Sequence, residues 1–468
     1  MLHIQIFNHH IKLPYVLLWI LEFTILVGCA YISVIYSGGR ESVGVFDPPS
    51  FQYGLIFASV MMLSAFAMGV YEAGVSEGFG SMMVRTVVSY CLLGALAMLI
   101  LYYLVPALSI GRGALFGAVM LALGAVLLLR RLFYSLVDIA KLKRRILVLG
   151  AGKRAKSILD NISEEALIGS EIVGFIPTDQ DACEIEPRWL LNAAGGIERL
   201  VKKHHVDEIV IAADERRRDR GGFFPLEDLL DCKMAGTQIT EVVEFYEREF
   251  ARIELPEINT SWMVFSDQFR YSLIRDKSKR LFDLSVSLVL LFFAWPFMLL
   301  TAVSVYLESG SPIIYRQDRV GFKGRVFPIY KFRSMCQDAE KDGKAKWAQK
   351  NDSRITRVGA FIRNTRLDEL PQIFNVLRGE MSFVGPRPER PEFVAELNEM
   401  LPFYDLRHRV KPGIMGWAQL KYSYGASLDD AANKLVYDLY YVKNHSLLLD
   451  VLVAVQSVEV VLLGKGVR

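Results

Sequence analysis

Long apolar runs separated by short polar connections dominate the first third of the chain. Four such runs cover residues 14–36, 51–71, 86–105 and 113–129. A helix needs about 20 apolar residues to cross the hydrocarbon core of a bilayer, so three runs are long enough and the fourth is marginal. Because the connections carry little charge, the pattern favours membrane helices over buried helices of a soluble core. We therefore predict a four-helix transmembrane bundle over residues 1–135.

Cationic residues gather where the fourth run ends, and they predict the orientation of the bundle. The connection at residues 38–50 contains a single cation, Arg40. The cluster after the fourth run consists of Arg130, Arg131, Lys141, Lys143, Arg144 and Arg145. Since cytoplasmic flanks are enriched in Lys and Arg, we expect the remainder of the chain to lie in the cytoplasm. Glu22, inside the first run, is expected at the interface or facing the bundle.

The pattern changes after residue 140 to short apolar strands that alternate with amphipathic helices. An apolar strand at residues 146–149 leads into Gly150-Ala151-Gly152, a helix and further strands at 172–176 and 208–212. This alternation predicts a Rossmann-like α/β domain with a parallel sheet over residues 140–265. The glycine spacing is compatible with a dinucleotide site, but the acidic residue expected after the second strand is poorly placed. We expect a structural or oligomerising role and no bound cofactor.

Composition agrees with a chain that is partly membrane-embedded and partly exposed to water. The 468 residues are 52% hydrophobic and the formal net charge is only +3, so bulk charge does not indicate a nucleic-acid partner. The cysteines lack metal-like or paired spacing, which is typical of reduced thiols. They are Cys29, Cys91, Cys183, Cys232 and Cys336.

An adjacent pair of carboxylates, Asp368 and Glu369, is the strongest chemical signal in the chain. Arg366 lies two residues before it, and Arg387 is held between two prolines some twenty residues later. One carboxylate can attack phosphorus while the other holds a divalent ion, and cations can neutralise phosphoryl oxygens. We predict a phosphate site at this pair, with Arg366 and Arg387 as phosphate ligands. Pro371 also predicts a helix that begins nearby.

Lys331 and Arg333 follow an apolar, strand-like run, and their chemistry allows two interpretations. They can bind substrate phosphate, or they can be structural partners of buried carboxylates. We include both as candidate phosphate-binding residues. For Asp318 and Arg319, which precede them, no role follows from their chemistry.

Several ordered motifs of the last third resemble the bacterial sugar transferase family, the polyprenyl-phosphate sugar-1-phosphate transferases of exopolysaccharide and O-antigen assembly. The matching segments are residues 331–335, 367–372, 385–388 and 411–417, within a catalytic domain expected at residues 275–468. With its membrane bundle and Rossmann-like domain, the chain is similar to the long form of the family, which includes undecaprenyl-phosphate galactose and glucose phosphotransferases.

This resemblance implies a reaction in which a UDP-sugar and a polyprenyl phosphate give UMP and a polyprenyl-diphosphate sugar. It implies that Asp368 is the nucleophile, forming a covalent phosphosugar intermediate, and that Glu369 holds Mg²⁺. The implied setting is the bacterial inner membrane, where a mainly α-helical catalytic domain faces the cytoplasm. The sugar and the oligomeric state stay open, with a homodimer as one candidate.

An apolar run at residues 281–307 is long enough to be a fifth span, but Pro296 must kink or break its helix. A span would place the phosphate site outside the cell, away from nucleotide-activated donors. We therefore expect a re-entrant helix that returns to the cytoplasmic face. The family usually has Asn-Trp-Ser near the C-terminus, where this chain has Asn444-His445-Ser446. The helix that follows is interrupted by charges and is expected to be interfacial.

Two other classes of protein are alternatives to this interpretation. A nucleotide-sugar oxidoreductase or epimerase would use the Gly150 turn, but residues 150–275 contain no Tyr-x-x-x-Lys pair. A transporter or membrane scaffold is a non-enzymatic alternative. The apolar runs offer little charge for a substrate path, and scaffolding would leave the acid pair and its arginines unexplained.

Overall fold

The computed structural model describes residues 3–6, 9–36, 48–68, 70, 79–105, 112–136, 143–164, 170–178, 183–214, 224–255, 273–336, 354–422 and 427–462. The chain forms two compact units, Met1–Phe250 and Ala251–Arg468. The first unit contains the apolar bundle and the parallel sheet, and the second contains the acidic pair. The predicted limits of three separate domains, 1–135, 140–265 and 275–468, stay predictions.

Apolar helices build the N-terminal part of the first unit, after a hairpin of β1 (His3–Ile6) and β2 (His9–Lys12). They are α1 (Leu13–Tyr36), α2 (Pro48–Ala67), α4 (Phe79–Val88), the π-helix η1 (Ser89–Gly94), α5 (Ala95–Leu104) and α6 (Arg112–Leu136). Among the described residues, Val16–Tyr36, Met82–Leu104 and Gly113–Phe133 are long and apolar enough to cross a membrane, whereas Phe51–Ala67 is shorter. Three of the four predicted spans are thus confirmed in length and apolar character, including the run at 113–129 that its sequence length left marginal, whereas the run at 51–71 forms a shorter apolar helix. The layout of the helices in a bilayer stays a prediction.

A buried ion pair links the first and last helices of this bundle. Arg130 on α6 donates from Nε and Nη2 to the two carboxylate oxygens of Glu22 on α1, at 2.5 and 2.9 Å. Its Nη1 donates to the hydroxyl of Thr86 on α4 at 2.6 Å. Glu22 and Arg130 are 0% and 1% exposed. Glu22 therefore faces the bundle as expected, but Arg130 lies inside it and is not a solvated flanking cation.

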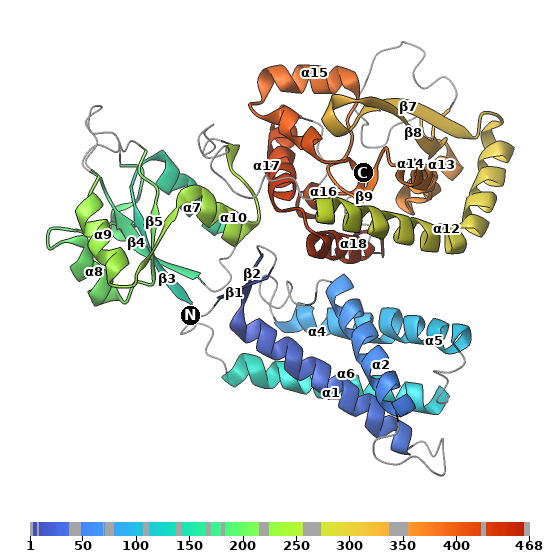
Figure 1. Cartoon of the computed structure of the whole chain (residues 1–468), viewed down its shortest axis with the longest axis horizontal. Helices are drawn as coiled ribbons and strands as arrows, with labels where there is room; N and C mark the ends of the chain where they lie inside the picture. Colours follow the sequence, from blue (N-terminus) through green and yellow to red (C-terminus); the bar gives the residue numbers. More distant parts are fainter. Residues whose placement is uncertain are drawn as a thin grey trace. The chain divides into compact units, whose positions relative to one another are not determined.

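The C-terminal part of the first unit is a parallel sheet in the order β4-β3-β5-β6. Its strands are β3 (Arg144–Leu149), β4 (Ser170–Ile176), β5 (Glu208–Ile211) and β6 (Gln238–Glu241). Its helices are α7 (Lys153–Glu164), η3 (Pro187–Trp189), α8 (Ile197–His204), α9 (Leu226–Met234) and α10 (Val242–Phe250). Helices α8 and α9 cover one face of the sheet, and α7 and α10 cover the other (Figure 1). The predicted parallel α/β arrangement is confirmed.

The second unit is mostly helical, with two small pairs of strands. It begins with α12 (Leu273–Ser309), followed by a hairpin of β7 (Ile314–Val320), η7 (Phe322–Gly324) and β8 (Val326–Phe332). Next come α13 (Arg357–Asn364), η8 (Leu367–Gln372), α14 (Ile373–Arg378) and β9 (Ser382–Val384), which pairs in parallel with β10 (Gly413–Met415). The remaining helices are α15 (Pro391–Met400), η9 (Tyr404–Arg409), α16 (Trp417–Lys421), α17 (Leu428–Asn444) and α18 (Leu447–Leu462).

Helix α12 has an exposed apolar middle between two ends that are both attached to the second unit. Near its start, the carboxylate of Asp283 accepts a hydrogen bond from the backbone N–H of Phe383 at 2.9 Å. Near its end, Val305 packs against Phe332 and Ile362. Side chains such as Phe292, which is 69% exposed, cover the middle. The apolar segment Arg275–Ser309 is long enough to cross a membrane.

Pro296 lies inside α12, where it supplies no backbone N–H and crowds the preceding turn. Figure 1 shows that α12 bends along its course, so that its two ends run in different directions. A proline-induced kink is the expected physical cause of such a bend.

Helix α18 is attached to the start of α12 through a buried carboxylate. Asp450 is only 1% exposed, and its Oδ2 accepts from Nζ of Lys279 at 2.7 Å. Its Oδ1 accepts from the hydroxyl of Tyr441 on α17 at 2.6 Å. Lys279 also donates to the carbonyl of Val384 at 3.0 Å. Asp450, expected to interrupt an interfacial helix, thus points into the protein, while the interfacial position of α18 stays a prediction.

His445, at the position where the family that the sequence resembles usually has tryptophan, gives the second unit an acid-sensitive position. Burial lowers the pKa of His445 to about 4. A histidine that is neutral in the folded protein is protonated more readily after unfolding, so stability falls as the pH drops below about 6.5. We expect His445→Phe to remove roughly 2–3 kcal/mol of the stability loss between pH 6.5 and 4. Thermal unfolding of both proteins at the two pH values measures this difference, and equal losses would contradict the prediction.

Candidate active site

The acidic pair lies on a short 3₁₀ helix, η8, at the centre of the second unit. Arg366 precedes this helix in the left-handed backbone conformation, with φ of 59°, and turns the chain out of α13. Asp368 and Glu369 follow in the first turn and are 7% and 8% exposed. The 3₁₀ helix begins at Leu367 and contains Pro371, and α14 begins at Ile373, close to Pro371 as predicted.

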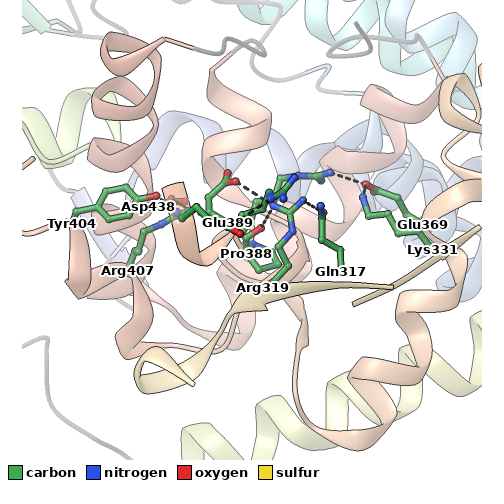
Figure 2. A network of polar contacts seen from close by, with 12 residues as sticks. Gln317, Arg319, Lys331, Glu369, Pro388, Glu389, Tyr404, Arg407 and Asp438 are labelled. Atoms are coloured by element: carbon green, nitrogen blue, oxygen red, sulfur yellow. Dashed lines mark hydrogen bonds and ion pairs between the residues drawn. The ribbon is translucent and has the colours of Figure 1, made fainter. Parts of the chain in front are cut away.

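Two cations from different elements converge on one oxygen of Glu369. Lys331, on β8, donates from Nζ to Oε1 of Glu369 at 2.9 Å. Arg387, in the segment after β9, donates from Nη2 to the same oxygen at 2.8 Å. Figure 2 shows Lys331 directed at Glu369. Residues that are far apart in the sequence are thus brought together as the motif predicts, although their catalytic roles stay predictions.

These cations separate the protonation behaviour of the two neighbouring carboxylates. Burial alone would raise the pKa of Glu369, but Arg387 and Lys331 outweigh it and hold that pKa well below the usual range. Burial raises the pKa of Asp368, and the negative charge of Glu369 adds to the effect. Oδ1 of Asp368 is buried and has no hydrogen-bond partner among the described residues. Glu369 is therefore held as an anion by two cations, whereas Asp368 has an oxygen available to bind a ligand.

Arg333, the other candidate on β8, attaches the end of α12 to the site. Its Nη2 donates to the carbonyls of Ser309 and Gly310 at 2.6 and 2.7 Å. These carbonyls lie where α12 ends, so Arg333 satisfies groups that a helix leaves unpaired. Its buried Nε and Nη1 have no partner in the described part of the chain, and the residue lines the cavity beside Asp368. Arg333 thus stabilises the end of α12 through Nη2, while its Nε and Nη1 remain available to bind an anion.

A cavity of about 810 Å³ contains the acidic pair and reaches the apolar helix. Leu290 of α12 and Ser457 of α18 contribute to its wall, so the cavity extends from the site to both apolar helices. Its cationic lining residues are Arg319, Lys331, Arg333, Arg354, Arg363, Arg366, Arg387, Arg390, Arg407 and Lys434. Such a cationic wall beside two carboxylates suits a ligand with several phosphates.

The segment that carries Arg387 is held tightly against its neighbours. A Cβ atom at Gly385 would lie 2.3 Å from the carbonyl oxygen of Lys411, so only glycine permits this approach. Arg319 on β7 donates from Nη1 to the carbonyl of Pro388 at 3.1 Å and to Glu389 at 3.3 Å, as Figure 2 shows. Arg319, for which no role could be predicted, therefore supports the backbone next to Arg387.

Sequence reasoning also missed Arg363, Arg407 and Asp438. Arg363 on α13 lies close enough to Asp368 to lower the pKa of that carboxyl, partly offsetting its burial. Arg407 on η9 and Asp438 on α17 form a buried ion pair at 2.8 Å. Arg407 is separated from Arg387 by 20 residues and from Asp438 by 31, and no local pattern connects the three positions. The motif at residues 411–417 begins just after Arg407, but it does not indicate that Arg407 pairs with Asp438.

Mg²⁺, which the family resemblance implies, is compatible with the residues at this site. Mg²⁺ prefers oxygen ligands and is commonly held by one or two carboxylates together with substrate phosphates and water. The unpartnered Oδ1 of Asp368 could supply one oxygen ligand, and Glu369, whose Oε1 accepts from Lys331 and Arg387, could supply its other carboxylate oxygen. The part of the chain that the structure describes contains no group of three or more His, Cys, Asp or Glu side chains suited to a metal. A site completed by substrate phosphates therefore fits better than an all-protein cage.

The glycine turn that begins at Gly150, in the first unit, is poorly suited to bind a nucleotide phosphate. Gly150 has φ of +131°, and a Cβ there would lie 2.5 Å from the carbonyl oxygen of Ala212, which directly follows the neighbouring strand β5. The close approach explains the glycine structurally. The backbone N–H groups of Lys153 and Arg154, at the start of α7, donate to the carboxylate of Asp214 at 2.8 and 3.0 Å. A dinucleotide fingerprint places a pyrophosphate at this helix start. The acidic side chain of Asp214 occupies that position, which disfavours a nucleotide phosphate.

Asp214→Ala is expected to destabilise the start of α7 by about 1 kcal/mol, because two backbone donors lose their acceptor. Hydrogen exchange of the Lys153 and Arg154 amides should become faster in the variant, by an amount that corresponds to this loss. Amides in the ladder between β3 and β5 serve as the internal control. Unchanged exchange at the two helix amides would contradict the capping role of Asp214.

A carboxylate pair held by cations, in a cavity that reaches an apolar helix, defines a membrane protein suited to phosphate chemistry. The sequence pattern described as "Bacterial sugar transferase" matches residues 274–464. An undecaprenyl-phosphate galactose phosphotransferase of Salmonella typhimurium is 32% identical over 69% of this chain and 69% of its own length. The chain belongs to the bacterial sugar transferase family.

Two further relatives are similar over shorter shares of their own length. The UDP-N-acetylgalactosamine-undecaprenyl-phosphate N-acetylgalactosaminephosphotransferase of Aeromonas hydrophila is 41% identical over 55% of this chain and 60% of that protein. A UDP-glucose:undecaprenyl-phosphate glucose-1-phosphate transferase of Xanthomonas campestris is 33% identical over 67% of this chain and 65% of that protein. The chain thus spans less than two thirds of the length of these two relatives.

Proposed function

We propose that this protein transfers a sugar-1-phosphate from a UDP-sugar to undecaprenyl phosphate, on the cytoplasmic face of the bacterial inner membrane. Relatives from three bacteria are named for sugar-phosphate transfer to undecaprenyl phosphate. The observation that carries the proposal is the acidic pair, in which Lys331 and Arg387 hold Glu369 while Oδ1 of Asp368 is left without a partner. The reaction would be the first membrane step of exopolysaccharide or O-antigen assembly.

The proposed chemistry proceeds by two displacements at the same phosphorus atom. A carboxylate oxygen of Asp368 attacks the β-phosphorus of the UDP-sugar, and the bond from that phosphorus to the bridging oxygen breaks. UMP leaves with the electron pair, and the sugar phosphate is bound covalently to Asp368. A phosphate oxygen of the lipid then attacks this phosphorus and displaces the carboxylate. The products are UMP and the undecaprenyl-diphosphate sugar, and Asp368 is regenerated.

The cations around Asp368 and Glu369 reduce the electrostatic repulsion between the attacking carboxylate and the phosphate of the substrate. Arg363 and Arg366 precede η8 in the chain and line the cavity, where their charge can balance phosphoryl oxygens. Arg333 lines the same cavity, and its Nε and Nη1 have no partner among the described residues. When bound, Mg²⁺ would be held by Glu369 with Asp368 nearby and would supply further neutralisation of phosphate charge. The cationic wall thus compensates for the weak nucleophilicity of a carboxylate.

We infer that α12 is a re-entrant helix and not a span. Its first turns contact β9 through Asp283, and its last turns contact β8 through Val305 and Phe332. Both ends therefore belong to one compact unit, and the bend at mid-helix allows the exposed apolar middle to enter a leaflet and return. This arrangement would bring the lipid phosphate to the cavity beside Leu290.

Release of UMP by the detergent-solubilised protein tests the proposal. The assay contains undecaprenyl phosphate, Mg²⁺ and one UDP-sugar at a time, including the glucose, galactose and N-acetylgalactosamine donors that the names of relatives suggest. Lipid-dependent release with one donor would identify the sugar and support the function. Absence of release with every donor, in protein with a cooperative unfolding transition, would overturn it.

A further inference from the structure

The backbone of Arg387 is bound from behind by an arginine that makes no contact with Glu369. Arg407 donates from Nη2 to the carbonyl oxygen of Arg387 at 2.9 Å and to Oδ2 of Asp438 at 2.8 Å. Its Nη1 donates to the hydroxyl of Tyr404 at 2.6 Å. Figure 2 shows Arg407 between Tyr404 and Asp438, on the far side of the network from Glu369. A chain of contacts thus runs from Asp438 through Arg407 and Arg387 to Glu369.

This ion pair is too well buried to serve as an ordinary surface bridge. Arg407 is 6% exposed and Asp438 is 3% exposed. A buried pair is tolerated when its geometry is good and further hydrogen bonds satisfy most of the remaining groups. Here Nη1 and Nη2 of one guanidinium have three acceptors, while its Nε has no partner among the described residues. A lysine ammonium lacks the planar fork that reaches these acceptors together. The chemistry therefore selects arginine, and the bond to the Arg387 carbonyl ties the pair to the site.

We propose that Arg407 and Asp438 are a positioning pair that sets the place of the Arg387 guanidinium on Glu369. This inference rests on the proposed function. Arg387 has little backbone freedom between two prolines, so moving its carbonyl also moves the start of its side chain. A displacement of about 1 Å in a catalytic group can cost about 10²-fold in rate. Arg407 and Asp438 thus act on the reaction through Arg387.

A double-mutant cycle between Asp438 and Arg387 tests this route. Asp438→Asn is expected to lower kcat about tenfold while the donor KM changes less than about twofold, because binding groups stay in place. Arg387→Gln should lower kcat by about 10²-fold. In the Arg387→Gln background, Asp438→Asn should have no further effect, since the group it positions is gone. Effects that multiply would show that Asp438 acts independently, and would overturn the inference.

Two further variants separate positioning from a general loss of structure. Asp430→Asn makes the same chemical change on α17, where the carboxylate caps the helix through Ser427, and it should leave kcat unchanged. Arg407→Lys retains the charge opposite Asp438 and should give a partial loss that also vanishes in the Arg387→Gln background. If Asp438→Asn does not unfold cooperatively, Arg407→Lys takes its place in the double-mutant cycle. Wild-type protein without lipid-dependent UMP release would refute the proposed function, whereas an active wild type with a multiplicative cycle refutes only the positioning role.

Discussion

Asp368→Asn should reduce lipid-dependent UMP release by on the order of 10³-fold or more, because an amide cannot form the phosphosugar bond. The substitution is nearly isosteric. Oδ1 of Asp368 has no hydrogen-bond partner among the described residues, so little structure depends on it. The variant should therefore unfold at nearly the wild-type temperature. The loss would then report chemistry and not folding.

Trapping of the intermediate gives a second readout for the same variant. Wild-type protein incubated with a UDP-sugar labelled in the sugar, without lipid acceptor, should retain label after denaturation, and Asp368→Asn should not. Asp318→Asn is the matched control, since Asp318 is exposed on β7 and contacts neither member of the acidic pair in the described structure. Label on the Asp368→Asn protein would assign the nucleophile to another residue.

Replacement of Glu22 by leucine is expected to destabilise the apolar bundle by about 3–5 kcal/mol, because the charge of Arg130 would remain buried without its carboxylate. The pair is 0% and 1% exposed, so water cannot compensate for the loss. Thermal unfolding of the detergent-solubilised protein measures the change. The double variant Glu22→Leu, Arg130→Met should recover most of the loss, since two apolar residues replace both charges. A double variant no more stable than Glu22→Leu would contradict this account.

Features that depend on local periodicity were predictable from the sequence. The apolar runs indicated membrane helices because their length matches the thickness of a bilayer. In the first unit, short apolar strands that alternate with helices along the chain indicated a parallel sheet, because the strands of such a sheet are covered by helices on both faces. The spacing around Asp368 and Arg387 matched ordered motifs of a family. The structure accordingly brings Lys331 and Arg387 together at Glu369.

Features that depend on distant partners could not be predicted in this way. Arg130 is indistinguishable in sequence from a solvated flanking cation, since its partner Glu22 is 108 residues away. The same is true of Arg407 and Asp438, which meet only when η9 packs against α17. Asp214 follows a strand and gives no sign that its carboxylate occupies the start of α7. A pattern reports which positions are buried, but the partner of a buried charge is a property of the tertiary fold.

The attachment of both ends of α12 to one unit has an evolutionary consequence. The segment that matches the family, residues 274–464, begins within this helix, so it includes both attachments of α12 to the second unit. Gene fusion or loss could exchange the partner domains around such a segment without changing how the acidic pair meets its acceptor. Selection on the N-terminal bundle and the parallel sheet would then be free to follow cellular context, such as assembly or regulation, while the chemistry is inherited as one piece.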